Sequence, residues 1–295
     1  MPAPTTVAVL GTGALGHAMA VRLADRELTV RVWNRTPQRA AAVVAERGQV
    51  AAHEQVADAV AGADVVLTVV RDDAALESLA DAVLAAMPPG GVWVQASTIG
   101  PDAARRSARR AAEAGVAYVD APVSGSTVPA RSGTLVWLVA GASSAIDAAR
   151  PVLDALGSSV QVLGAEGWEG SAAKLVVNAW MASAVVAAAD ALALADRLGV
   201  GHDALRDVLG AGALAMPYAL AKMQAMDAGS HEPGFAVELA LKDLRLAARD
   251  AAFSTPLLDA VAARFVAAEA AGHGGRDVAA VHLVSAPPAA EGSGG

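Results

Sequence analysis

The chain has no cysteine among its 295 residues. This absence excludes disulfide bonds, a zinc site built from thiolates and a cysteine nucleophile. The six histidines are scattered without the spacing of a ligand set, so the sequence indicates no metal site.

A run of basic residues is also absent, and the formal net charge is −8. Such a chain is a poor partner for nucleic acid or an anionic membrane surface. No basic stretch precedes the first apolar segment, which is expected to be a strand and not a signal peptide. The most apolar segment contains Lys174, Asn178 and Asp190, which disfavours a membrane span. We therefore expect a soluble, cytoplasmic protein whose partner is a small molecule.

Lysine is scarce, since only three of the 22 basic residues are lysines. Arginine is always protonated, whereas a buried lysine can exchange its proton near neutral pH. Lys174 stands near the start of a long helical pattern, and Asn178 follows one turn later on the same face. Apolar neighbours on nearly every side predict a helix that is buried all round. We interpret Lys174 as a candidate proton donor, with a solvated lysine near a helix start as the alternative.

A glycine-rich turn follows the first predicted strand, residues 6–10. Strand, glycines and helix occur in the order of a dinucleotide-binding unit. Gly11 permits a tight turn, Gly13 lets the backbone approach a pyrophosphate, and Gly16 allows the helix to pack closely on the strand. A glycine-rich turn without a ligand is the alternative. The predicted cofactor-binding residues of this segment are Gly11, Gly13, Ala14, Leu15 and Gly16.

The second predicted strand, residues 28–33, is followed by Asn34, Arg35 and Thr36. An NAD-preferring site usually has an acidic residue here, which binds the ribose 2′-hydroxyl. An arginine beside a hydroxyl can instead bind a 2′-phosphate through charge-assisted hydrogen bonds. The segment therefore favours NADPH over NADH and adds these three residues to the predicted cofactor site. In the alternative, Arg35 only faces solvent.

The first half of the chain alternates apolar strands with alanine-rich helical segments. This pattern predicts an α/β fold with an N-terminal Rossmann domain, a doubly wound and mostly parallel sheet. After residue 164 the periodicity is helical and indicates an all-α C-terminal domain. The last residues are rich in proline and glycine and predict a disordered tail. The predicted domains are residues 1–165, 166–284 and 285–295, and further strands are expected at 65–70, 92–96, 117–120, 135–140 and 160–163.

Four motifs resemble, in their order along the chain, those of the β-hydroxyacid dehydrogenases, which include 3-hydroxyisobutyrate dehydrogenases and glyoxylate/succinic semialdehyde reductases. The first is the glycine motif. The second and third are Ser97-Thr98-Ile99-Gly100-Pro101 and Asp120-Ala121-Pro122-Val123-Ser124-Gly125. The fourth is the segment from Gly170 to Lys174 together with Asn178. The pair Lys242-Asp243 also matches, so the resemblance covers most of the chain.

The resemblance implies an enzyme that interconverts a small hydroxy acid and the corresponding aldehyde or keto acid with NADP(H). Lys174 would protonate the carbonyl oxygen as hydride arrives, or act as the base in the reverse direction. Asn178 would orient the amine and the substrate. Thr98, Ser124 and Gly125 would hold the substrate carboxylate through hydroxyl and backbone N–H donors. Ordinary turn chemistry is the alternative for these last three residues.

The resemblance also assigns contacts with both substrate and cofactor to Lys242, and a cofactor contact to Thr98. Lys242 lies on a helix predicted over residues 235–253, which the family folds back over the cleft. A surface ion pair between Lys242 and Asp243 is the alternative.

Two positions depart from the family pattern and leave the substrate open. Ser126-Thr127 stands where relatives commonly have a second glycine, and Gln95 stands where an aspartate is frequent. The segment 34–36 resembles the reductase branch that uses NADPH, which favours reduction of an aldehyde or keto acid.

Three other functions share parts of this pattern. Imine reductases resemble the architecture and the cofactor motif, but they typically have Asp or Tyr at the position of Lys174. A non-catalytic, dehydrogenase-like binding domain would be expected to lose the lysine. A 6-phosphogluconate dehydrogenase needs a longer helical domain and a basic phosphate-binding cluster, neither of which the sequence contains.

The predicted helix over residues 171–198 would be about 40 Å long. Its circumference is mostly apolar, and we expect one helical domain over residues 166–284 to cover it incompletely. The family that the chain resembles commonly forms dimers or tetramers. We therefore expect a homodimer or homotetramer.

Overall fold

The computed structural model describes residues 5–285. Contacts among these residues divide the chain after Leu175 into an α/β unit and a helical unit, and helix α8 (Glu169–Leu198) crosses this division. The order confirms the predicted fold class, an N-terminal Rossmann-like domain followed by an all-α domain. The domain limits at residues 165 and 284 stay predictions. The predicted tail lies, apart from Ser285, outside the described residues.

The described part of the chain forms one sheet of nine strands, in the order β3-β2-β1-β4-β5-β6-β8-β7, with β9 also paired to β8. The first six strands pair in parallel, and β8 runs antiparallel to β6 and β7. The predicted, mostly parallel sheet is therefore confirmed. The strands are β1 (Thr6–Leu10), β2 (Thr29–Trp33), β3 (Ala51–Ala52), β4 (Val65–Thr68), β5 (Val92–Gln95), β6 (Ala117–Asp120), β7 (Val123–Ser124), β8 (Leu135–Ala140) and β9 (Gly157–Gly164).

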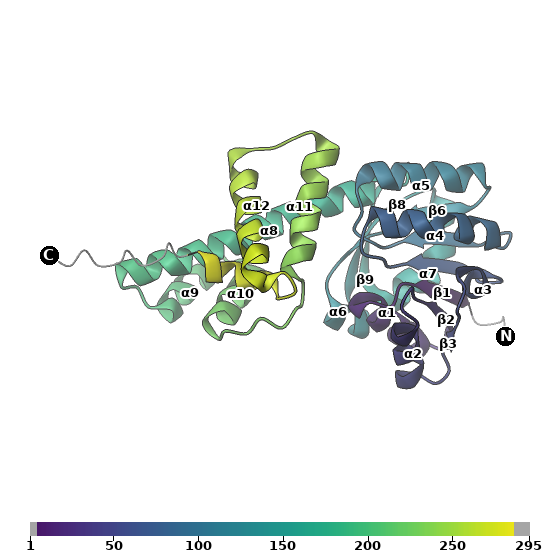
Figure 1. Cartoon of the computed structure of the whole chain (residues 1–295), viewed down its shortest axis with the longest axis horizontal. Helices are drawn as coiled ribbons and strands as arrows, with labels where there is room; N and C mark the ends of the chain where they lie inside the picture. The colour runs from purple at the N-terminus through teal and green to yellow at the C-terminus, as the bar shows by residue number, and fades with distance from the viewer. Residues whose placement is uncertain (1–4, 286–295) are drawn as a thin grey trace. The chain divides into compact units, whose positions relative to one another are not determined.

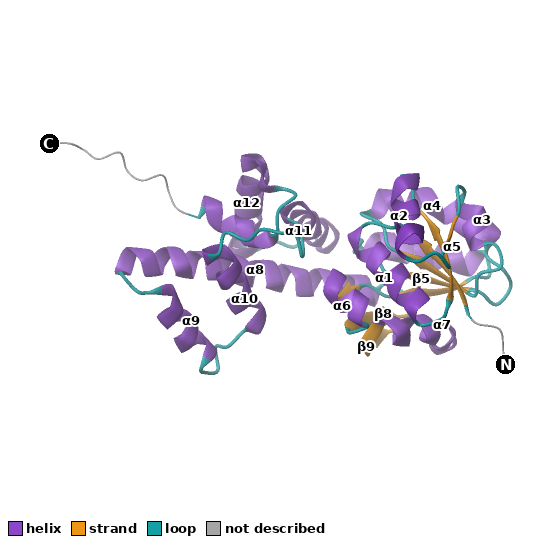
Figure 2. Ribbon diagram, turned by 90° about the horizontal axis from the view of Figure 1, so that it is seen from below, coloured by secondary structure: helices purple, strands orange, loops and turns teal. Residues whose placement is uncertain are grey.

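Helices cover both faces of the sheet, and each face has its own core. Along β1, Val7 and Val9 point into one core and Ala8 and Leu10 into the other. Strands that are buried on both faces are rich in valine and leucine throughout, as is typical of parallel sheets. Figure 2 shows the strands between the two helical layers. The first core contains α1 (Ala14–Asp25), α2 (Pro37–Glu46), α6 (Thr127–Ser132) and α7 (Ser143–Leu156), and the second α3 (Val56–Val60), α4 (Asp73–Ala86) and α5 (Pro101–Glu113).

The strand order reverses at β1, which lies between β2 and β4. In open α/β sheets, ligands bind at such a point, outside the carboxyl ends of the strands. The short strands β3 and β7 were not predicted, because two residues carry no readable alternation.

The helical unit is built around α8 (Figure 1). Its core joins Val185 and Leu192 of α8 to Met223, Leu241 and Phe265 from three other helices. The further helices are α9 (His202–Gly210), α10 (Pro217–Asp227), α11 (Val237–Ala251), α12 (Pro256–Ala268), the π-helical turn η1 (Glu269–His273) and the 3₁₀ helix η2 (Val278–Val284).

The prediction that α8 is buried all round is wrong for this chain. Val176 and Trp180 are 71% and 64% exposed, and Leu194 and Leu198 are exposed as well. The apolar pattern does not indicate which face of the helix is buried, because all faces are apolar. Only tertiary packing selects the buried face. In length and hydropathy α8 could span a membrane, but its buried residues pack into the core of the helical unit.

Candidate active site

The glycine loop between β1 and α1 has the close contacts that its sequence predicts. Gly11 has a φ of +100°, and a Cβ atom there would lie 2.3 Å from the carbonyl oxygen of Val69. A Cβ on Gly16 would lie 2.0 Å from the carbonyl oxygen of Gly11. Gly13, by contrast, has nothing within 4 Å of its Cβ position and is the N-cap residue of α1. The loop thus presents open backbone at the positive end of a helix, which suits a pyrophosphate.

Asn34 connects the glycine loop to the turn after β2. Its Oδ1 accepts a hydrogen bond from the backbone N–H of Thr12 at 3.0 Å, and its Nδ2 donates to the carbonyl oxygen of Thr36 at 3.0 Å. Arg35 is exposed, and Thr36 is the N-cap residue of α2. The predicted segment 34–36 therefore lies next to the glycine loop.

A pocket of about 600 Å³ opens at the N-terminus of α1. Three basic side chains line it, His17 from α1, Arg39 from α2 and Arg131 from α6, and Thr127 adds a hydroxyl. Arginines beside a helix N-terminus favour phosphate groups. The other lining residues are Thr12, Gly13, Ala14 and Ala42.

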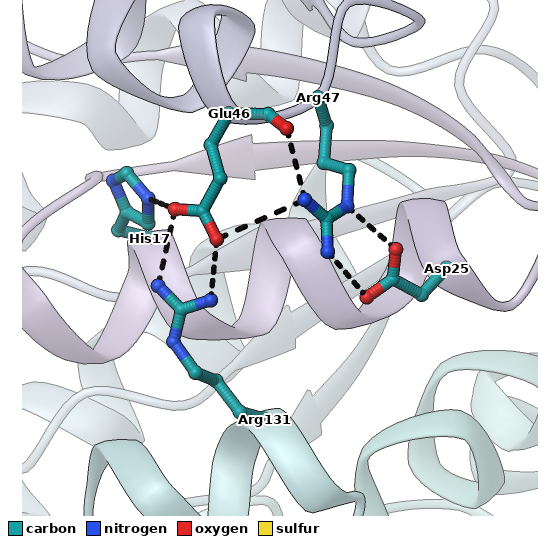
Figure 3. Close-up of polar contacts among 5 residues, drawn as sticks. All are labelled: His17, Asp25, Glu46, Arg47 and Arg131. Atoms are coloured by element: carbon teal, nitrogen blue, oxygen red, sulfur yellow. Dashed lines mark hydrogen bonds and ion pairs between the residues drawn. The ribbon is translucent and has the colours of Figure 1, made fainter.

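A network of charged side chains surrounds Glu46, at the end of α2 (Figure 3). Arg131 donates two hydrogen bonds to the Glu46 carboxylate, at 2.6 and 3.1 Å, and the His17 ring nitrogen Nε2 lies 2.7 Å from it. These contacts lower the pKa of Glu46 to about 2, with the Arg131 hydrogen bond as the largest cause. Next to it, Arg47 donates to the Asp25 carboxylate at 2.6 and 3.1 Å. The network joins α1, α2 and α6 at the pocket.

The carboxyl ends of β4, β5 and β6 carry a row of buried polar residues. Thr68, Gln95 and Asp120 are register neighbours, and each is 0% exposed. The side chain of Gln95 accepts a hydrogen bond from the backbone N–H of Ser97 at 2.6 Å and donates to its carbonyl oxygen at 2.9 Å. Gln95 thereby holds the loop that contains Thr98.

The carboxylate of Asp120 binds the first turn of α8. It accepts a hydrogen bond from the backbone N–H of Ser171 at 2.6 Å and another from the Ser171 hydroxyl at 2.7 Å. Burial raises the pKa of Asp120 to about 7, and hydrogen bonds from Ser171 and Gln95 limit the rise. Gly170 lies against the sheet, since a Cβ there would be 2.4 Å from the carbonyl oxygen of Leu138. The N-terminus of α8 is therefore held tightly on β6 and β8.

Lys174 follows one turn after this anchor. It is 9% exposed, and Asn178, a further turn along α8, is 4% exposed. Residues three and four apart lie on one helix face, so Ser171, Lys174 and Asn178 share a face of α8. An amine and an amide are thus presented side by side.

The predicted carboxylate-binding residues lie in two places of the α/β unit, the loop after β5 and the end of β7. Thr98 is half-buried and follows β5, whose carboxyl end lies on the same edge of the sheet as the glycine loop. Ser124 ends β7, and Gly125 has a φ of +129°. This positive φ favours glycine, and a Cβ on Gly125 would also lie 2.8 Å from the Leu135 side chain.

Two other predicted residues meet at one carboxylate in the helical unit. Asn178 donates to Asp243 at 2.6 Å, and the ammonium group of Lys242 lies 2.8 Å from the other oxygen of Asp243. Asp243 is buried, so both partners are held by a group that water does not screen.

Four residues of this arrangement had no predicted role. The role of Arg39 could have been predicted, because it lies in the first turn of the helix after Arg35. The contacts of His17, Arg131 and Ser171 could not be predicted, although Ser171 lies within the fourth motif, because their partners are distant in the sequence.

Comparison with known proteins gives two family models that together match residues 6–164 and 169–284. Residues 6–164 match the family model of the NAD binding domain of 6-phosphogluconate dehydrogenase. Residues 169–284 match the model described as NAD-binding of NADP-dependent 3-hydroxyisobutyrate dehydrogenase.

Individual relatives extend over most of the chain. Glyoxylate/succinic semialdehyde reductase 1 of Arabidopsis thaliana is 32% identical, over 93% of this chain and 96% of its own length. NAD-dependent L-serine dehydrogenase of Pseudomonas aeruginosa is 33% identical, over 85% and 88%. The structure of Mycobacterium tuberculosis 3-hydroxyisobutyrate dehydrogenase with L-serine has a TM-score of 0.87 at 30% identity and covers 96% of this chain and 100% of that one. This chain therefore belongs to the β-hydroxyacid dehydrogenase family, whose members are NAD(P)-dependent oxidoreductases acting on small hydroxy acids.

Proposed function

We propose that this enzyme interconverts a small hydroxy acid and the corresponding aldehyde or keto acid with NADPH, and that Lys174 is its general acid and base. The observation that carries the proposal is the placement of Lys174. Its amine is buried and lies one turn after Ser171 of α8, which is hydrogen-bonded to Asp120 at the carboxyl edge of the sheet. A buried lysine without a chemical task costs stability, so its presence favours a role in proton transfer.

The chemistry requires one hydride and one proton. The reduced nicotinamide, when bound, would supply the hydride for the carbonyl carbon. The Lys174 ammonium group gives a proton to the carbonyl oxygen, which becomes the hydroxyl of the product, and the neutral amine recovers a proton from solvent. In the reverse direction, the neutral amine takes the proton from the hydroxyl group. Asn178, on the same helix face, is proposed to orient the amine and the substrate.

The cofactor is proposed to be NADPH, with the glycine loop as its binding segment. The open space at Gly13, the N-cap residue of α1, fits a pyrophosphate. Arg35 and Thr36 are proposed to bind the 2′-phosphate, and Arg39, which lines the pocket, adds a second guanidinium group. Because the relative from Pseudomonas aeruginosa is NAD-dependent, the proposal of NADPH depends on the contacts with the 2′-phosphate.

Thr98, Ser124 and Gly125 are proposed to hold the substrate carboxylate. Hydroxyl and backbone N–H groups are suitable donors to an anion, and Gly125 leaves its backbone accessible. Lys242, paired with Asp243, is proposed to contact substrate and cofactor. The retained, buried Lys174 disfavours both an imine reductase and a non-catalytic binding domain.

The test is a substrate panel with both cofactors. Short aldehydes and keto acids that carry a carboxylate are assayed with NADPH and NADH by absorbance at the nicotinamide band, and the hydroxy acids are assayed with the oxidised cofactors. We expect carboxylate-bearing carbonyl compounds to be reduced with NADPH, and amides of the same compounds to react poorly. Turnover of cyclic imines but of no carboxylate compound would overturn the proposal.

A further inference from the structure

The carboxylate of Asp120 lies where three elements meet. It ends β6, it accepts both hydrogen bonds from Ser171 in α8, and it neighbours Gln95 at the end of β5. Asp120, Gln95 and Ser171 are each 0% exposed. A buried carboxylate with this many partners fixes the elements that supply them.

The contact with α8 replaces an ordinary helix cap. The first N–H groups of a helix lack partners within it, and the N-terminus carries partial positive charge. Here the acceptor comes from strand β6, where the Asp120 carboxylate accepts a hydrogen bond from the backbone N–H of Ser171. Gly170 permits this approach, because any larger residue would strike the Leu138 carbonyl oxygen. The first turn of α8 therefore has one position and one rotation on the sheet.

The orientation of Lys174 depends on the rotation of this first turn of α8. It is three residues after Ser171, so turning or withdrawing the first turn of α8 moves the amine with it. On the other side, Gln95 adds a hydrogen bond to Asp120 and clamps the backbone of Ser97, next to Thr98.

We propose that Asp120 is a positioning residue that aligns Lys174 with the Ser97–Thr98 loop by holding both through one buried carboxylate. The inference rests on the proposed function, since it assigns the effect of Asp120 to Lys174. Removing the carboxylate leaves the Ser171 N–H without its acceptor and frees the helix end to shift. A displacement of about 1 Å at a reacting group can lower turnover by roughly 10²-fold.

The decisive experiment is a double-mutant cycle between Asp120→Ala and Lys174→Met. We expect Asp120→Ala alone to lower kcat by roughly 10²-fold, with NADPH affinity nearly unchanged. In the Lys174→Met background, Asp120→Ala should have no further effect on kcat. Two independent losses that multiply would overturn the inference, as would normal turnover in Asp120→Ala. A loss of NADPH affinity parallel to the loss of kcat would also overturn it, because Asp120 would then only support the fold.

The conservative variant Asp120→Asn provides a rescue. Its amide oxygen can still accept from the Ser171 N–H, and its amide N–H can donate to the Ser171 hydroxyl. We expect this variant to recover most of the lost turnover. If Asp120→Ala does not fold, Ser171→Ala takes its place in the cycle, with the same outcomes.

Asp277 offers a matched control in the helical unit. Its buried carboxylate accepts hydrogen bonds from Lys222 at 2.6 Å and from the backbone N–H groups of Gly234 and Ala279 at 3.0 Å each. Asp277→Ala should lower stability in a similar way but leave kcat of the folded enzyme unchanged.

A spectroscopic measurement reports on position without turnover. With only three lysines, ¹³Cε-lysine labelling gives three signals that Lys→Arg variants assign. Asp120→Ala should move the signal of Lys174 and leave that of Lys222, whereas Asp277→Ala should do the reverse. An unmoved Lys174 signal would overturn the inference. Normal turnover in Lys174→Met would instead refute the proposed function, so the two failures are distinct.

Discussion

Two substitutions of Lys174 separate a proton donor from a structural lysine. Lys174→Met approximately keeps the volume of the side-chain stem and removes the ammonium group, so NADPH should still bind while kcat falls by roughly 10²–10⁴. Lys174→Arg should fail nearly as badly, because guanidinium does not release its proton and is wider than an amine. The measurement is kcat on the best carbonyl substrate, with NADPH affinity by fluorescence.

Lys222→Met is the control for these variants. Lys222 binds Asp277 in the helical unit and has no part in the proposed chemistry, so kcat should stay near that of the wild type. A purely structural role for Lys174 predicts instead that Lys174→Arg keeps a kcat close to that of the wild type. Near-normal turnover in that variant would refute the mechanism.

The proposed preference for NADPH is tested by a single substitution. Arg35→Asp would replace the proposed attraction to the 2′-phosphate by repulsion and should raise KM for NADPH, while KM for NADH should rise less or fall. Charge-assisted contacts contribute about 1.5–3 kcal/mol, a factor of roughly ten to a hundred. Arg26→Asp, at an exposed arginine just after α1, is the control and should leave both KM values unchanged. An unchanged preference in Arg35→Asp would show that Arg35 does not contact the cofactor.

Between elements, the pH dependence of stability tests the Glu46 network. Its contacts with Arg131 and His17 lower the pKa of Glu46 from 4.5 to about 2. A carboxyl with a lowered pKa stabilises the folded state above its unfolded pKa, and this contribution is lost as the pH falls through the folded value. Glu46→Gln should therefore unfold at a lower urea concentration than the wild type at pH 7. The difference should shrink between about pH 4.5 and pH 2.

The control for this element is Glu113→Gln, at the exposed end of α5. It should leave the urea midpoint near that of the wild type at every pH. A constant difference between Glu46→Gln and the wild type across the acid range would mean that the joint between α1, α2 and α6 does not depend on this charge.

For the whole molecule, the exposed apolar face of α8 predicts self-association. Val176, Trp180, Leu194 and Leu198 are large apolar residues on one helix and are exposed in the single chain. A large exposed apolar patch of this kind typically marks an interface. We expect the mass of a dimer or tetramer by light scattering at micromolar concentration, and a smaller species for Trp180→Glu.

Val162→Asp is the comparison for this prediction. Val162 is exposed to a similar degree on β9, and its substitution should leave the mass unchanged. A monomeric wild type would refute the prediction, and equal dissociation in both variants would mean that α8 is not the interface.

Many features of the fold and of the candidate site could be predicted, because the sequence patterns that indicate them span only a few residues. The glycine loop is read from three positions, since a turn, an open N-terminus and a close helix contact each require glycine within a few residues. The strands of the sheet are read from short valine-rich segments, and the pair Lys174 and Asn178 from the period of a helix.

Only the tertiary structure decided the remaining features. Asp120 and Ser171 are 51 residues apart, and Arg131 and Glu46 are 85 apart. Whether such residues meet depends on strand order and on where a connecting helix lands, which no local pattern contains. The same holds for α8, because a helix that is apolar all round does not specify which face is buried. Sequence by itself thus determined the kinds of elements, the glycine loop and the candidate lysine, since backbone sterics and helical period act over a few residues. The tertiary structure decided which groups bind the first turn of the helix that carries that lysine and which apolar face of the helix is exposed, because packing joins residues that the chain keeps far apart.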